Sequence, residues 1–156
     1  MNDPASVHAC AVLLGARAIL IRGPAGSGKS RLALALIQAT NAGRLPFARL
    51  IADDRVRLEA HHGRLLARAP ETIAGLIEVR GLGIRRVAHE PVAVVGLVVD
   101  LAAPDSERLP ASQKAAIDGI ALPRLAVASG VDPLPAVLAW LAIPDAGPDA
   151  VKMSEK

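Results

Sequence analysis

The chain has 156 residues, the size of one domain, and 52% of them are hydrophobic whereas only 1% are aromatic. A core of Ala, Val, Leu and Ile suits a buried α/β sheet, and a chain with one Phe and one Trp offers almost no stacking platform for single-stranded nucleic acid. The net charge of +3 comes mostly from scattered arginines. The single cysteine excludes a disulfide within the chain, and no apolar stretch is long enough to span a membrane. Because a signal peptide is also missing, we expect a cytoplasmic protein that binds neither nucleic acid nor membranes.

The first predicted element is a hairpin. Residues 7–14 and 17–23 are apolar strands on either side of Gly15-Ala16, a two-residue turn. Antiparallel pairing that starts at this turn places His8 opposite Gly23. The sequence therefore predicts that His8 lies beside the segment that begins where the second strand ends.

That segment reads GPAGSGKS and fits G-x-x-x-x-G-K-[ST], the loop that binds nucleotide phosphates. It leads into a predicted helix with Leu32 and Leu36 on one face, so the loop joins a strand to a helix, as the motif requires. Backbone N–H groups of such a loop bind phosphates, Lys29 reaches the outer phosphates, and the Ser30 hydroxyl ligates magnesium. The residues expected to bind the nucleotide are Gly23, Pro24, Ala25, Gly26, Ser27, Gly28, Lys29 and Ser30.

A loop over 41–47 precedes a strand over 48–54 that ends in Asp53-Asp54. An enzyme with a phosphate loop takes an acid from a second strand, and that acid either holds the water shell of the metal or accepts the proton of the attacking hydroxyl. Because successive strand residues point to opposite faces, one carboxylate of the pair is expected to face the phosphates, and the sequence leaves open which one.

The remaining elements are read in chain order from apolar runs and turn residues. They are a hairpin of 55–60 and 64–69, a helical turn at 70–75, a strand that begins at 76 and dissolves into glycines by 84, a strand at 92–101, a surface excursion or disordered loop at 102–119, a strand at 120–128 and a helix at 134–142. We expect a single domain over 1–143 and a frayed tail over 144–156.

The segment LIEVRGLGI carries two charged residues that a strand would place together. Glu78 and Arg80 share one face of the expected strand, while Ile77 and Val79 take the other face. The glycines that follow allow the backbone to approach a ligand closely. A salt bridge followed by a plain turn explains the pattern equally well.

Together, the histidine-bearing strand, GPAGSGKS, LIADDRV and IEVRGLGI resemble the catalytic domain of the HPr kinase/phosphorylase family, in the short form found in α-proteobacteria. The resemblance covers about residues 7–101. It implies an α/β P-loop domain with a central mixed sheet, related in its nucleotide site to phosphoenolpyruvate carboxykinase. It also implies transfer of a phosphoryl group from ATP, with Mg²⁺, to a serine of the phosphocarrier protein HPr, reverse phosphorolysis, and a homo-oligomer, in this family a hexamer.

The same resemblance implies roles for single residues. It places a base for serine phosphorylation within Asp53-Asp54 and a second magnesium ligand, beside Ser30, at Glu78. The residues that it marks as catalytic are His8, Lys29, Asp53, Asp54 and Arg80.

Two other functions stay open. One is a small-molecule kinase whose acceptor pocket is closed by residues 102–119. The other is a regulatory module that binds nucleotide without turnover. The second reading rests on the absence of any arginine after Arg124, where the family has a catalytic one, and on the short segment after the last helix.

Overall fold

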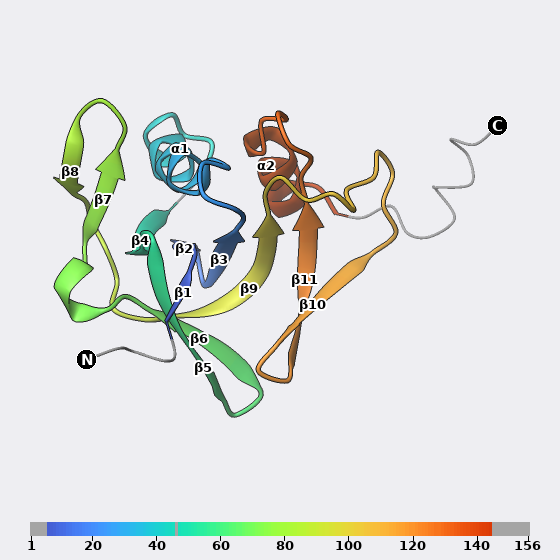
Figure 1. The fold of residues 1–156 in the computed structure, drawn as a ribbon, viewed down its shortest axis with the longest axis horizontal. Coiled ribbons are helices and arrows are strands. Elements are labelled where there is room, and N and C mark those ends of the chain that lie inside the picture. Colours follow the sequence, from blue (N-terminus) through green and yellow to red (C-terminus); the bar gives the residue numbers. More distant parts are fainter. Residues whose placement is uncertain (1–5, 46, 145–156) are drawn as a thin grey trace.

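A mixed sheet forks at its central strand and carries the phosphate loop at one end (Figure 1). The structure is a computed structural model and describes residues 6–45 and 47–144. Its strands are β1 (Ser6–His8), β2 (Cys10–Leu14), β3 (Arg17–Arg22), β4 (Ala48–Ala52), β5 (Arg55–His61), β6 (Arg64–Arg68), β7 (Leu76–Val79), β8 (Gly83–Arg86), β9 (Ala93–Asp100), β10 (Gln113–Ile117) and β11 (Ile120–Ala126). Its helices are α1 (Lys29–Asn41), the 3₁₀ turn η1 (Glu71–Ile73) and α2 (Leu134–Ala142).

The main sheet has the order β1-β5-β6-β9-β3-β2-β4, and β11 adds β10 beside it. β9 pairs in parallel with β3 and β11 and antiparallel with β6, so the sheet branches at β9 toward the β5–β6 and β10–β11 hairpins. Side chains of β9 enter the hydrophobic clusters on both faces of the sheet, which explains the apolar run of this strand. β7 and β8 form a small sheet of their own.

Two hydrophobic clusters lie on the two faces of this sheet. Helices α1 and α2 cover one face, where Leu32 and Leu36 of α1 pack against Ile19 and Leu97, as the helical spacing predicts. The other cluster contains Leu20, and residues of the two hairpins surround it. Within the described residues no helix is long and apolar enough to cross a bilayer.

The predicted first hairpin is confirmed near its turn and wrong at its far end. β2 and β3 pair from Leu14 opposite Arg17 to Cys10 opposite Ile21. The chain leaves this hairpin at Ala9, whose N–H donates to the carbonyl of Asp54. His8 therefore belongs to β1 and lies opposite Arg55 of β5, and the predicted pairing of His8 with Gly23 does not form.

Two further strands correct the sequence reading. The stretch 102–119 contains β10, which turns into β11 at Asp118-Gly119, and both residues have positive φ (50° and 79°). This Asp-Gly pair is a strong hairpin signal that the sequence reading missed. The glycine-rich end of LIEVRGLGI does not dissolve, because Gly81 and Gly83, with φ of 89° and 95°, turn the chain into β8. Residues 145–156, most of the predicted tail, lie outside the described residues.

Candidate active site

The loop between β3 and α1 has a conformation that only glycine permits at its first position. A Cβ on Gly23 would lie 2.5 Å from Ser27 Oγ and 3.1 Å from the carbonyl oxygen of Leu101. Lys29 donates to the carbonyls of Gly23 (2.8 Å) and Pro24 (3.2 Å), so its side chain folds back over the loop. The ammonium group and the N-terminus of α1 thus converge on one small region.

This loop offers donors that an anion would satisfy. The first N–H groups of a helix have no intrahelical acceptor, and the helix dipole makes this end positive. Ser27 Oγ is buried and has no hydrogen-bond partner among the residues that the structure describes. Together with the Lys29 ammonium, these groups suit the phosphates of a nucleotide.

Asp53 lies directly behind the loop and is the center of the candidate site. Its carboxylate is buried (5% exposed) and accepts three hydrogen bonds. Ser30 Oγ donates to Oδ1 over 2.6 Å, Cys10 Sγ donates to the same oxygen over 3.0 Å, and the Glu78 N–H donates to Oδ2 over 3.0 Å. Carboxylate, hydroxyl and water oxygens are the ligands that Mg²⁺ prefers, so Ser30 and Asp53 fit a magnesium site. Ser30 belongs to the first turn of α1, and Asp53 directly follows β4.

Asp54 lies apart from this buried cluster. Its φ of 71° turns the chain at the end of β4, so the two neighbouring carboxylates separate. The Asp54 side chain is 73% exposed, and its Oδ1 lies 3.7 Å from Nδ1 of His8. Because the chain passes at Ala9 from β1, which pairs with β5, to β2, which pairs with β3, His8 lies beside Asp54 and not beside the phosphate loop.

Cys10 contacts the site although its sequence context indicates core packing alone. The thiol is fully buried, as expected, and it also lies 3.8 Å from Ser30 Oγ. Burial and the neighbouring charge of Asp53 raise the pKa of the Cys10 thiol to about 12. No sequence signal identifies this contact, because Cys10 in β2 and Asp53 just beyond β4 are 43 residues apart in the chain.

Glu78 and Arg80 do not meet as a shared strand face predicts. Glu78 belongs to β7 and has an exposed side chain, whereas β7 ends at Val79 and the exposed Arg80 lies in the turn beyond it. Glu78 reaches the site through its backbone N–H, which leaves its carboxylate free of ion pairs within the described part of the chain.

A partly buried ion-pair network lies on the other side of the loop. Arg22, the residue before Gly23, donates to both oxygens of Asp100, and Arg124 donates to Asp100 and Asp105. Burial raises the pKa of Asp100, but the hydrogen bonds from both arginines outweigh this effect and hold it below its usual value. The hydrogen bonds to Asp105 and Asp100 raise the pKa of Arg124. This network fixes the strand end that leads into the loop, and sequence reading missed it.

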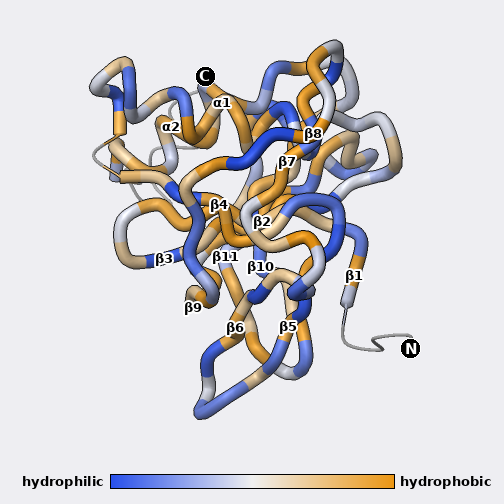
Figure 2. Tube along the Cα trace, turned by 90° about the vertical axis from the view of Figure 1, so that its left-hand side faces the viewer, coloured by the Kyte–Doolittle hydropathy of each residue, from blue (hydrophilic) through white to orange (hydrophobic). Residues whose placement is uncertain are grey.

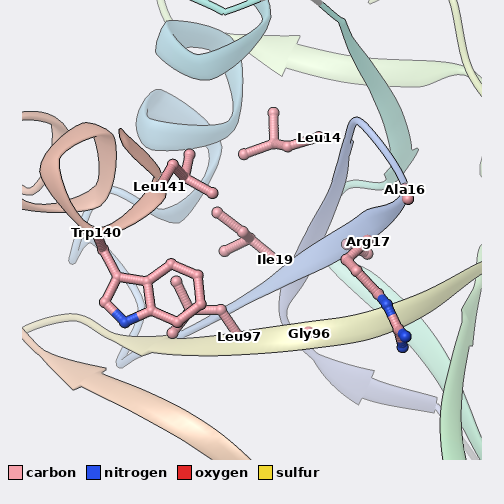
Figure 3. A pocket seen from close by; sticks show the side chains of 9 residues that line it. Leu14, Ala16, Arg17, Ile19, Gly96, Leu97, Trp140 and Leu141 are labelled. Atoms are coloured by element: carbon pink, nitrogen blue, oxygen red, sulfur yellow. The ribbon is translucent and has the colours of Figure 1, made fainter. Parts of the chain in front are cut away.

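A hydrophobic pocket of about 210 Å³ lies elsewhere (Figure 3). Trp140 and Leu141 of α2 cover Ile19 and Leu97, and Arg17 borders the pocket at the start of β3. Because the phosphate loop follows the end of β3, the pocket and the loop lie at opposite ends of that strand. The pocket therefore takes no part in the candidate site.

Comparison with known proteins finds a matching family and similar proteins. Residues 1–114 match the family described as HPr Serine kinase C-terminal domain. The HPr kinase/phosphorylase of Clostridium beijerinckii is 40% identical over 78 residues, which cover 50% of this chain and 24% of that protein. The HPr kinase/phosphorylase of Halalkalibacterium halodurans is 35% identical over 112 residues, which cover 67% of this chain and 34% of that protein. The matched part thus spans about a quarter to a third of these relatives.

A solved structure has the same fold. It is described as the Hpr(Ser) kinase/phosphatase from Coxiella burnetii and superposes with a TM-score of 0.72. The superposition covers 96% of this chain and 93% of that chain, at 24% sequence identity. At this identity the superposition establishes the shared fold alone.

Proposed function

The chain belongs to the family of HPr serine kinase C-terminal domains, and from this premise we propose that it transfers a phosphoryl group from ATP to a serine of HPr or of an HPr-like carrier. The observation that carries the proposal is the 2.6 Å hydrogen bond from Ser30, at the end of the phosphate loop, to the buried carboxylate of Asp53. A plain turn between a strand and a helix needs neither this hydroxyl nor this acid.

The loop residues would bind the nucleotide. The N–H groups at the start of α1 and the buried Ser27 hydroxyl would donate to phosphate oxygens. Lys29 would exchange its bonds to the Gly23 and Pro24 carbonyls for the outer phosphates. Arg22, held by Asp100, fixes the start of the loop. These contacts support the assignment of Gly23 through Ser30 to the nucleotide.

Three side chains would form the magnesium site, two as direct ligands and one through the water shell of the ion. Ser30 donates its proton to Asp53, so the lone pairs of its oxygen remain available to a cation. Asp53 would hold the water shell of the metal, and the exposed carboxylate of Glu78 would add a ligand from β7. When bound, Mg²⁺ supplies positive charge that stabilises the charge developing on the transferred group.

Asp54 is the better candidate for the base. Both oxygens of Asp53 already accept hydrogen bonds and the residue is only 5% exposed, so the hydroxyl of an acceptor protein has no free carboxylate oxygen to approach there. Asp54 is exposed and has only His8 beside it among the described ion pairs. We therefore assign to Asp54 the proton of the acceptor serine and to His8 the orientation of Asp54. Arg80, exposed at the turn after β7, would interact with the transferred group from the solvent side.

The finer family properties belong to the same proposal. They are a cytoplasmic location, a homo-oligomer of hexameric form, reverse phosphorolysis and a nucleotide site related to that of phosphoenolpyruvate carboxykinase. The resemblance supports each of them.

Incubation of the protein with ATP, Mg²⁺ and HPr from the same cell tests the function. We expect serine phosphate on HPr and none on HPr whose acceptor serine is replaced by alanine. ATP turnover with a metabolite and none with HPr would favour a small-molecule kinase. Nucleotide binding without transfer to either acceptor would favour the regulatory module. Arg22 and Arg124 are both held in ion pairs, so neither is an obvious replacement for the catalytic arginine that the family has after the position of Arg124.

A further inference from the structure

The β7–β8 hairpin exposes two large hydrophobic side chains next to the candidate site. Leu82 is 63% exposed and Ile84 is 61% exposed, although they lie only two residues apart. Figure 1 shows the hairpin beside α1 and separate from the main sheet, and Figure 2 shows hydrophobic residues among the hydrophilic ones along it. Exposed apolar groups that gather in one place mark a surface that is covered by a partner.

The register of the hairpin separates its two faces. Ile77, opposite Arg85, is 1% exposed and packs into the cluster that contains α1. Glu78 lies opposite Ile84, so these two side chains share the other face. Directly opposite residues have Cβ atoms about 4.5–5.5 Å apart. Ile84 is therefore the immediate neighbor of the carboxylate that we assign to the metal.

The base of the hairpin is fixed to the site while its tip remains exposed. The Glu78 N–H donates to Asp53 Oδ2 over 3.0 Å, and Ile77 anchors β7 under α1. The turn beyond Val79 has no residue in either hydrophobic cluster. A partner that touches this tip would thus be held at a defined position relative to Asp53 and Asp54.

The charge of the hairpin is positive. Arg80, Arg85 and Arg86 are exposed, and Glu78 is the only acid between residues 76 and 86. Arg86 lies opposite Leu76 and thus shares the face of Ile84. A complementary partner surface would present apolar side chains with carboxylates around them.

We propose that Leu82, Ile84 and Arg86 form the docking surface for the acceptor protein, which would place its serine hydroxyl between the hairpin and Asp54. The inference rests on the proposed function and adds the partner's chemistry: a folded protein with an apolar patch and acidic neighbours beside the phosphorylated serine. A small-molecule acceptor would leave Leu82 and Ile84 exposed, because two exposed side chains on one hairpin do not enclose a metabolite.

Steady-state kinetics of Leu82→Ser and Ile84→Ser with HPr as the acceptor test this surface. Truncation of a central apolar contact costs about tenfold in affinity. We expect KM for HPr to rise about tenfold in each variant, with kcat and the affinity for ATP and Mg²⁺ within about twofold of the unchanged protein. The matched control is Ile143→Ser, because Ile143 is 66% exposed at the end of α2, on the other side of α1.

The charged part has its own test. Arg86→Gln should raise KM for HPr at low salt and lose this effect as salt increases. Arg64→Gln, at the exposed first residue of β6, should change neither KM nor its salt dependence. Circular dichroism melting of every variant checks that the fold is kept.

The outcomes separate the two proposals. If the unchanged protein does not phosphorylate HPr, the proposed function fails. If it does, and Leu82→Ser and Ile84→Ser keep the KM of Ile143→Ser, the docking surface is wrong. A selective loss of ATP affinity in the hairpin variants would also overturn it, because the hairpin would then serve the nucleotide.

Discussion

Exchange of each neighbouring aspartate for asparagine should affect a different step. Asp53→Asn removes the charge that accepts the 2.6 Å bond from Ser30 and presents an NH₂ group to Cys10 and Ser30 or to the Glu78 N–H. Bonds of this length from a hydroxyl to a charged oxygen are the strong class. Loss of such a partner behind a metal ligand costs 10–100-fold in metal affinity, which corresponds to about 1.4–2.8 kcal/mol.

Asp54→Asn should leave binding intact and slow the chemistry. Its side chain is 73% exposed, and asparagine tolerates the φ of 71°, so the fold and the Mg²⁺ affinity should stay unchanged. Loss of a general base should reduce the rate of transfer by about 10²–10⁴-fold. Calorimetric titration of ATP at several Mg²⁺ concentrations and single-turnover transfer to HPr measure the two effects. Weakened Mg²⁺ binding in Asp54→Asn, with normal binding in Asp53→Asn, would refute the assignment.

Three further predictions concern the surroundings of the site. Lys29→Ala should abolish transfer and keep the melting temperature, because the lysine contributes charge rather than packing; a large fall in melting temperature would contradict this. Asp100→Asn should reduce the free energy of unfolding at pH 7 by about 1–3 kcal/mol, measured with urea. The pKa of Asp100 is lowered in the fold, so the stability that this carboxylate contributes is present above its ordinary pKa of 3.8 and is lost as pH falls through the lower folded pKa. Asp100→Asn should therefore lose less stability on acidification than the unchanged protein. An equal loss in both proteins would contradict the pairing. Cys10, the single thiol, should react with iodoacetamide only after unfolding, and rapid labelling of the folded protein would contradict its burial.

Local sequence patterns predicted the elements well where a single turn or the spacing of apolar residues determines the structure. Gly15-Ala16 fixed the register of β2 and β3, and the spacing of Leu32 and Leu36 identified the buried face of α1. The strand order could not be predicted in this way, because pairs such as β3 with β9 depend on contacts between segments far apart in the sequence.

Sequence motifs named candidate residues for the site, and the roles of these residues stay predictions, whereas their geometry could not be predicted from residue types. The loop motif names Lys29 and Ser30 by their chemistry, whereas the separation of Asp53 from Asp54 depends on one backbone angle at the end of β4. The position of His8 depends on the change of pairing partner at Ala9, where the chain passes from β1 to β2. The apolar run continues through Ala9, so the sequence pattern does not indicate this change. The contact of Cys10 with Asp53 is likewise a tertiary contact that residue type does not reveal.

The mass of intact HPr after incubation with this protein, ATP and Mg²⁺ tests the central claim most directly. The account predicts that HPr gains the mass of one phosphoryl group, located on a serine, and that the gain disappears with Lys29→Ala. Unmodified HPr under conditions in which a full-length HPr kinase/phosphorylase modifies it would contradict the claim. Modification that persists in Lys29→Ala would contradict the assignment of the phosphate loop.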